Sequence, residues 1–231
     1  MRQLRTSFYN VCFLAIRGMY IFIYLILFTS LFTGCATTSM VPTTLSETVQ
    51  VVLEPVDIAG HLDFVSQIQD DEIKVIHKYK DGKTYKTGAP WKVPQIESMR
   101  QILQRYMHLK FDPIAEDSVA VRIILEKVKS VYQLNESATS TALKTLFGGG
   151  TSQATYYCSH EGRVEILNSS GEILLSRRIA SSASSQDVEA LGYVVDKKGS
   201  RDVIMGSVCN SSINRFTLQL DKLINSALTK Q

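Results

Sequence analysis

An apolar run near the start of the chain, Met19–Phe32, ends three residues before a cysteine and sets the organisation of everything after it. The run has 14 residues. A helix needs about 20 residues to cross the hydrocarbon core, so this length favours the apolar part of a cleaved export signal. The first 34 residues contain no acid, and their positive charges are Arg2, Arg5 and Arg17. The pattern predicts a signal peptide over residues 1–34, ending before Cys35.

The segment Leu31–Cys35 (LFTGC) resembles the lipobox of bacterial lipoproteins, with Phe32 where that family usually has Leu. The resemblance implies that the chain is cleaved before Cys35 and that this cysteine carries the lipid which holds the protein on a membrane. An uncleaved membrane anchor with an incidental cysteine is the alternative. Ala36 follows the cysteine, where many inner-membrane lipoproteins have Asp. The resemblance therefore implies an outer-membrane location on the periplasmic side.

The charge balance of the expected mature chain argues against a nucleic-acid partner. Cleavage removes three arginines and no acid, which leaves 22 basic and 22 acidic side chains. The excess positive charge of the whole chain therefore belongs to the signal peptide and gives no support to nucleic-acid binding. The mature chain has 197 residues, which suits one domain.

Two cysteines remain in the expected domain after Cys12 leaves with the signal and Cys35 takes lipid. They are Cys158 and Cys209. Because an exported domain meets an oxidising compartment, we predict a disulfide between them. Two buried free thiols are the alternative.

Residues 35–47 are rich in Ser and Thr and predict a flexible lipidated tether, and residues 48–231 predict a single α+β periplasmic domain. We expect an antiparallel or mixed sheet with two main helices packed on one face. The helices are expected over 94–109 and 211–228, where apolar residues recur at helical spacing. Residues 180–206 are expected to form a long loop.

Strand patterns recur between these helices. The first strand is expected over Thr48–Ile58, and the clearest one begins at Val119, with a bulge near Lys127 where the alternation slips. A hairpin with the four-residue loop 168–171 would place Ile166 opposite Ile173 and Val164 opposite Leu175. By the same alternation, Cys158 is expected to point into the core.

Residues 74–92 are the segment that stands out as a contact surface. Asp81-Gly82 between two extended stretches predicts a hairpin with a two-residue loop. Lysines and aromatic residues crowd around it and could contact anionic headgroups, glycan phosphates or an acidic partner. A solvated edge hairpin is the alternative. The partner-contact candidates are Lys78, Tyr79, Lys80, Lys83, Tyr85, Lys86 and Trp91.

The sequence nominates no catalytic residue, metal site or cofactor. Its four histidines, His61, His77, His108 and His160, lack metal-ligand spacing to each other or to Cys and carboxylates. The acidic run Asp70–Glu72 is more typical of a solvated surface than of a cation site. Gly148–Gly150 lacks the Lys-Ser or Lys-Thr that a phosphate loop requires.

The expected domain resembles a group of small envelope lipoproteins: the YajG-type lipoproteins, the auxiliary lipoproteins of ABC-type transport systems, and the TolB-like domain of curli-secretion and penicillin-binding-protein activator lipoproteins. Four segments carry the resemblance: QVVLEPVD (50–57), LQRYMHL (103–109), VAVRIILEKV (119–128) and NSSGEILLSRRI (168–179). It implies a non-enzymatic accessory or scaffold that assists an envelope protein assembly. A glycan- or lipid-binding module and a hydrolase with an unrecognised site are the alternatives.

Overall fold

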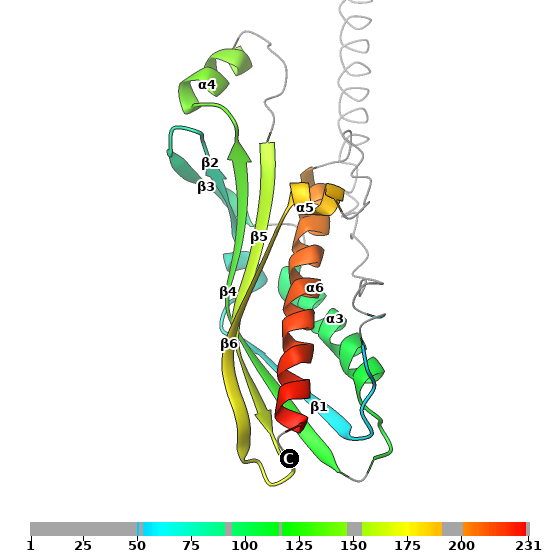
Figure 1. Ribbon diagram of the computed structural model, residues 1–231. Helices are drawn as coiled ribbons and strands as arrows, with labels where there is room; N and C mark the ends of the chain where they lie inside the picture. The colour runs from blue at the N-terminus through cyan, green and yellow to red at the C-terminus, as the bar shows by residue number, and fades with distance from the viewer. Residues whose placement is uncertain are drawn as a thin grey trace, which may run out of the picture. The chain divides into compact units, whose positions relative to one another are not determined.

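The computed structural model describes residues 50, 53–90, 94–115, 117–146, 154–190 and 201–229, with side chains for all of these except 85–90, 144–146, 188–190 and 201–203. Strands and helices are interspersed along the chain (Figure 1). In order they are β1 (Ala59–Ser66), the 3-10 turn η1 (Asp70–Glu72), β2 (Lys74–Lys78), β3 (Thr84–Pro90), α3 (Gln95–Lys110), β4 (Ser118–Leu134), α4 (Ala138–Leu146), β5 (Ala154–Leu167), β6 (Ile173–Ser184), α5 (Ser185–Ala190) and α6 (Arg201–Leu228).

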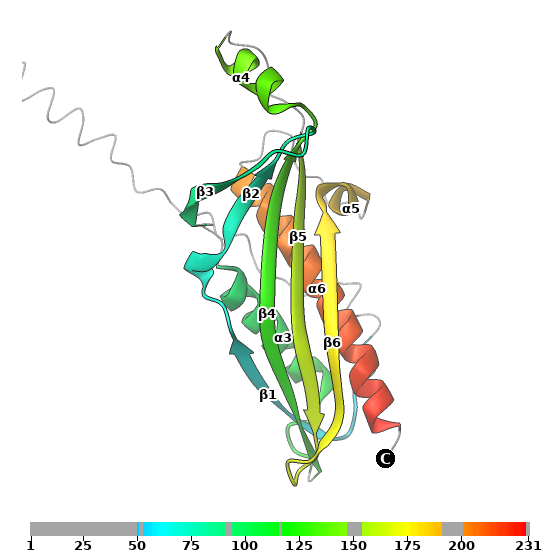
Figure 2. The ribbon, with the colours of Figure 1, turned by 90° about the vertical axis from the view of Figure 1, so that its left-hand side faces the viewer.

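The strands form one mixed sheet of six, in the order β3-β2-β4-β5-β6, with β1 also paired to β4. β4, β5 and β6 are antiparallel. β1 runs parallel to the first half of β4, and β2 runs parallel to its last part, so the two short strands lie one after the other along the same edge of β4 (Figure 2). The expected fold class, α+β with a mixed sheet, is confirmed.

A bulge divides β4 into a lower half, Ser118–Leu125, and an upper half, Lys127–Leu134. The register with β5 shifts between Leu125 and Lys127, where the sequence pattern predicts it. Gly162 faces this point on β5, and a Cβ there would come within 2.8 Å of the Ile124 carbonyl oxygen. The extra residue in β4 therefore requires glycine on the neighbouring strand.

The two long helices, α3 and α6, pack on one face of the sheet, as expected (Figure 1). The expected apolar stripes of both helices are buried against it, with Leu223 only partly buried. The opposite face of the sheet is not covered by any helix of the described part of the chain, and Figure 2 looks onto it. We call it the uncovered face.

Three sequence-based expectations about element positions are wrong. Within the expected strand Thr48–Ile58, the described residues 53–58 form only an isolated bridge, Val56 with Phe111, and the first strand begins at Ala59. The expected loop 180–206 instead contains the end of β6, α5 and the first turns of α6. Cys209 therefore lies inside α6, and the helix begins ten residues before the expected start at 211.

Both hairpins have three-residue loops, not the two and four residues expected. Gly82 and Gly171 each take a left-handed conformation, with φ of 80° and 84°. In each loop the glycine N–H donates to the carbonyl three residues earlier, at 3.0 and 2.9 Å. Such a loop is a tight turn followed by a left-handed residue, the position that glycine fills without strain.

The register of the β5–β6 hairpin also differs from the expectation. Ile166 faces Leu175 instead of Ile173, and Val164 faces Arg177. The three-residue loop moves the pairing by one residue, and a shift between Ile166 and Leu167 moves it by one more. Ile173 is consequently half exposed, at 52%.

The outer edge of β6 is closed along its second half by side chains of α6. Arg215 donates to the Ser182 carbonyl at 2.8 Å, and Gln219 donates to the Ala180 carbonyl at 3.0 Å. Asp187 lies 3.3 Å from the other end of the Arg215 guanidinium and fixes its direction. These contacts replace the hydrogen bonds that a further strand would make.

Candidate contact surface

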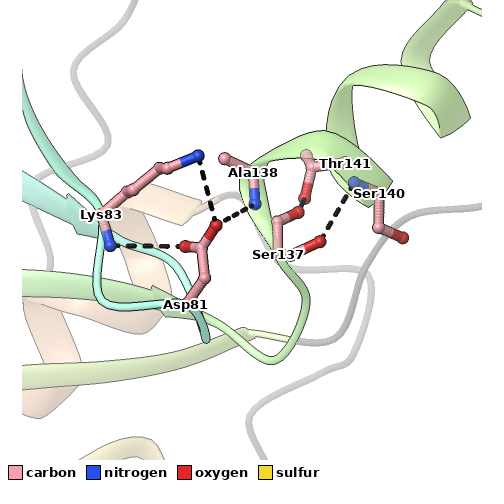
Figure 3. Close-up of polar contacts among 6 residues, drawn as sticks. All are labelled: Asp81, Lys83, Ser137, Ala138, Ser140 and Thr141. Carbon is pink, nitrogen blue, oxygen red and sulfur yellow. Dashed lines mark hydrogen bonds and ion pairs between the residues drawn. The ribbon is translucent and has the colours of Figure 1, made fainter.

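The turn of the β2–β3 hairpin is fastened to the start of α4. Asp81 lies at the centre of this contact (Figure 3): its carboxylate accepts from the Lys83 N–H at 3.3 Å and from the Ala138 N–H at 3.4 Å. The Lys80 N–H also donates to the Glu136 carbonyl at 2.9 Å. Negative charge at a helix N-terminus is favourable. The Asp81 carboxylate therefore holds the hairpin turn against α4.

The partner-contact candidates divide into three groups. Lys78, Lys80 and Lys83 are exposed, and only Lys83 has an ion-pair partner among the described residues, Asp81 at 3.7 Å. Tyr79 is partly buried and packs against a small apolar cluster around Tyr132 and Met205. Tyr85 and Lys86 lie in β3 with side chains outside the described set, and Trp91 lies outside the described residues.

The lower half of the uncovered face is covered by ion pairs that run across the strands. Arg122 on β4 lies 2.7 Å from Asp63 on β1 and 3.6 Å from Glu165 on β5. At the bulge, Arg178 lies 2.7 Å from Glu126, and Lys127, the first residue of the upper half of β4, lies 3.3 Å from Glu161. Positive and negative charges therefore alternate and compensate one another here.

The upper half of the uncovered face has a different composition. Its strand positions alternate with buried partners such as Ser130 and Cys158, which face α6, so the intervening side chains face outward. They include three exposed lysines for which no ion pair is found among the described residues. We define the upper face as Lys74, Ile76 and Lys78 on β2, Lys129, Val131 and Gln133 on β4, and Tyr157 and Ser159 on β5.

Sequence reasoning finds only the β2 part of this surface. Lys129, Val131 and Tyr157 join it through the sheet register, since Ile76 pairs with Val131 and Val131 pairs with Tyr157. The outward position of Lys129 and Val131 could have been read from the alternation of β4 beyond its bulge. The parallel pairing of β2 with β4 has no local signal.

The predicted disulfide is present in the structure, where it joins Cys158 on β5 to Cys209 on α6. The two Cα atoms are 5.1 Å apart, and both residues are buried. Cys158 points into the core as expected. Buried Gln95 donates to the Ser130 hydroxyl at 2.9 Å beside it, so the start of α3 is tied to the same region.

A serine–histidine contact exists between the sheet and α6. His160 Nδ1 lies 3.0 Å from the Ser212 hydroxyl, which also lies 3.3 Å from the Ser181 hydroxyl. Both His160 and Ser212 are fully buried, and burial lowers the pKa of His160 to about 4. Nucleophilic chemistry requires a substrate to reach the serine. At this depth the contact serves packing, and it gives no support to the hydrolase alternative.

A second buried polar cluster holds the chain before β1 against the two helices. The Lys110 ammonium donates to the Glu54 carbonyl and to Asn225 Oδ1, both at 2.7 Å, and lies 3.0 Å from Asp221. Tyr106 donates to Asp221 at 2.9 Å. Burial, reinforced by the neighbouring carboxylate, raises the pKa of the Tyr106 phenol. The Lys110 ammonium therefore has a partner for each of its three protons.

The acidic run has a structural role. Asp70 accepts a hydrogen bond from the Ile96 N–H at 3.0 Å, at the start of α3, and Glu72 accepts one from the Gln69 N–H at 2.9 Å. Both carboxylates satisfy backbone donors. Among the described residues, no group of His, Cys, Asp and Glu is arranged to hold a metal ion.

The other histidines lie apart from one another. His61 is exposed on β1, His108 is exposed on α3, and His77 stacks on Tyr132 with ring centroids 5.0 Å apart. None of the helices whose residues are described is long and apolar enough to cross a membrane.

No known family matches the sequence, and no curated protein matches it. Solved structures with a related arrangement are found at low similarity. A Xanthomonas campestris protein of the family DUF330 is 12% identical, with a TM-score of 0.41, covering 73% of this chain and 86% of that one. A minor lipoprotein from Acinetobacter baumannii is 11% identical, with a TM-score of 0.36 and coverage of 75% and 94%. A Helicobacter pylori homologue of neuraminyllactose-binding hemagglutinin is 12% identical, with a TM-score of 0.35 and coverage of 79% and 90%. These values assign no family and no function.

Proposed function

We propose that the protein is a lipid-anchored lipoprotein of the bacterial envelope and acts as a non-enzymatic accessory subunit of a larger assembly. The pattern of the first 35 residues supports the anchor, with lipid on Cys35. Ala36 after the cysteine supports the outer membrane, with the domain on the periplasmic side. The disulfide between Cys158 and Cys209 is in keeping with an oxidising compartment.

The observation that carries the accessory role is the contrast between the two halves of the uncovered face. In the lower half, basic groups such as Arg122 and Arg178 have acidic neighbours within ion-pair distance. The upper face exposes Lys74, Lys78 and Lys129 without such neighbours among the described residues. Exposed charge of one sign beside apolar side chains is a feature of surfaces that dock another molecule.

Mass spectrometry of the protein extracted from intact cell membranes tests the anchor. We expect a mature N-terminus at Cys35 carrying two or three acyl chains, because one chain alone gives only marginal binding. A Cys35→Ala variant is the matched control and should keep residues 1–34 and no lipid. An unmodified Cys35 with residues 1–34 still attached would contradict the proposal.

The accessory role is tested in the same cells by a photo-crosslinking residue placed at Val131, on the upper face. We expect a discrete crosslinked product there and none from the same residue placed at Ile114, an exposed loop position remote from this surface. Equal labelling at both positions would contradict a docking role for the upper face.

A further inference from the structure

The register of the sheet orders the upper face into rows that cross β2, β4 and β5. Ile76, Val131 and Tyr157 are paired across the three strands and form an apolar row. Lys74 and Lys129 each precede the paired residues Val75 and Ser130, so they are neighbours on one side of this row. Lys78, paired with Gln133, lies on the other side. The apolar row is therefore bordered by lysines on both sides.

The positive charges of these lysines are unfavourable for the folded sheet. Like charges at neighbouring positions of adjacent strands repel, which weakens the sheet at Lys74 and Lys129. The upper face as defined contains no acid. The next outward acid along β5, Glu161, already pairs with Lys127 at the bulge, and Asp63 and Glu126 are paired too. An acidic ligand would remove the repulsion and cover the apolar row at the same time.

From this arrangement we propose that the upper face binds an acidic amphipathic helix of a protein partner, laid across the strands along the apolar row. The inference rests on the proposed accessory role and names the chemistry of the partner. Four residues of strand separate Lys74 from Lys78, a distance of about 13 Å at ~3.3 Å per residue. A helix with its side chains is about 10–12 Å wide, so it fits between Lys78 on one side and the pair Lys74 and Lys129 on the other.

The apolar row also matches such a helix in length. Three neighbouring strands span about 10 Å between the outer two, at ~4.8 Å per step. About two helical turns cover that distance. Apolar residues at helical spacing would lie on Ile76, Val131 and Tyr157, and acidic residues on either flank would reach the lysines.

A membrane surface fits the same lysines less well. Asp63, Glu126 and Glu165 lie on the lower half of the same face, 39%, 19% and 13% exposed in their side chains. Because Arg122 and Arg178 compensate these carboxylates, the lower half gives a flat anionic surface no net attraction. A helix that covers only the upper face avoids them.

Binding of a synthetic peptide to the mature chain in detergent tests the proposal. The probe is a 14-residue helical peptide with one leucine stripe flanked by glutamates, and the control peptide has glutamine in place of every glutamate. We expect the acidic peptide to bind at least tenfold more tightly than the control peptide. The difference should shrink as salt is added, because salt screens exposed charges.

Two variants with the same change of net charge localise the binding. Lys74→Glu with Lys78→Glu and Lys129→Glu should weaken binding of the acidic peptide at least tenfold. Arg105→Glu with Arg177→Glu and Lys222→Glu changes exposed basic residues on α3, β6 and α6, away from the upper face, and should change it less than twofold. Circular dichroism of both variants verifies the fold. Equal weakening by the two variants would overturn the proposal.

A further substitution separates the apolar contact from the charges. Tyr157→Ser should weaken peptide binding without changing its salt dependence.

Binding to vesicles of phosphatidylglycerol is the last measurement. If the first triple variant abolishes vesicle binding and leaves peptide binding unchanged, the surface is a membrane contact and the helix proposal is wrong. Because lipid on Cys35 is measured separately, that result would leave the anchor intact.

Discussion

The Lys110 ammonium lies 3.0 Å from an Asp221 carboxylate oxygen, and the two side chains are 0% and 8% exposed. We expect Lys110→Met to lower the free energy of unfolding by about 3–5 kcal/mol, because Asp221 would stay buried without its partner. Urea denaturation of the mature chain measures the change. Lys110→Met with Asp221→Leu should recover much of the loss. Arg100→Ala, which removes an exposed pair with Glu97, should change it by only about 0.5 kcal/mol. A small effect of Lys110→Met would contradict the burial of the pair.

His160 should make the domain less stable as pH falls below neutral. Its pKa in the fold is about 4, below the ordinary value of 6.5, so the unfolded chain takes up a proton that the folded chain excludes between these values. Stability is fully present above pH 6.5 and is lost toward pH 4. Between pH 7.5 and 5 the loss from this group is about 2 kcal/mol. Denaturation at both pH values, with His160→Gln as control, measures it. An equal pH dependence in the two proteins would refute this assignment.

The disulfide should contribute a large part of the domain's net stability. Cys158 and Cys209 are 51 residues apart, and loop-closure entropy for a loop of this size gives about 4 kcal/mol. Cys158→Ser with Cys209→Ser should therefore melt well below the oxidised protein. Thiol counting on denatured, unreduced material tests the bond itself, and two free thiols in protein taken directly from intact cells would show that it does not form there.

Gly60 on β1 lies under the ring of Phe111, and a Cβ at this position would overlap ring atoms. Gly60→Ala should therefore destabilise the domain by about 1–3 kcal/mol, as overpacking does. In a Phe111→Ala background the same substitution should have little effect. A double-mutant cycle by urea denaturation measures the coupling. Additive effects of the two substitutions would contradict this contact.

Local periodicity was enough to locate the elements that bury a regular stripe. The alternation of β4, including its slip at Lys127, and the helical spacing of α3 both correspond to the structure. The first turns of α6 were not predicted because Gly206, Ser207 and Asn210 are weak helix formers. Tertiary packing overrides that weakness, since Met205, Val208 and Cys209 are buried against the sheet.

The candidate surface was found only in part because half of it depends on strand order. Lys78, Lys80 and Lys83 were visible as a cluster near one turn. Lys129 becomes their neighbour only when β2 pairs in parallel with β4, a long-range choice that no short segment encodes. Tyr79, a candidate by sequence, directly follows β2 and turns inward because the alternation of that strand continues through it.

The two α6 side chains on β6 also bear on how copies of this protein avoid one another. Arg215 and Gln219 occupy the Ser182 and Ala180 carbonyls, so the second half of this edge offers no acceptor at those points to an incoming chain. Along the first half of the β6 edge, the described contacts include no such side-chain hydrogen bonds, and Ile173 at its start is half exposed. Strand-to-strand aggregation would therefore begin at the β5–β6 turn, and removing Arg215 and Gln219 would extend the same template along the whole strand.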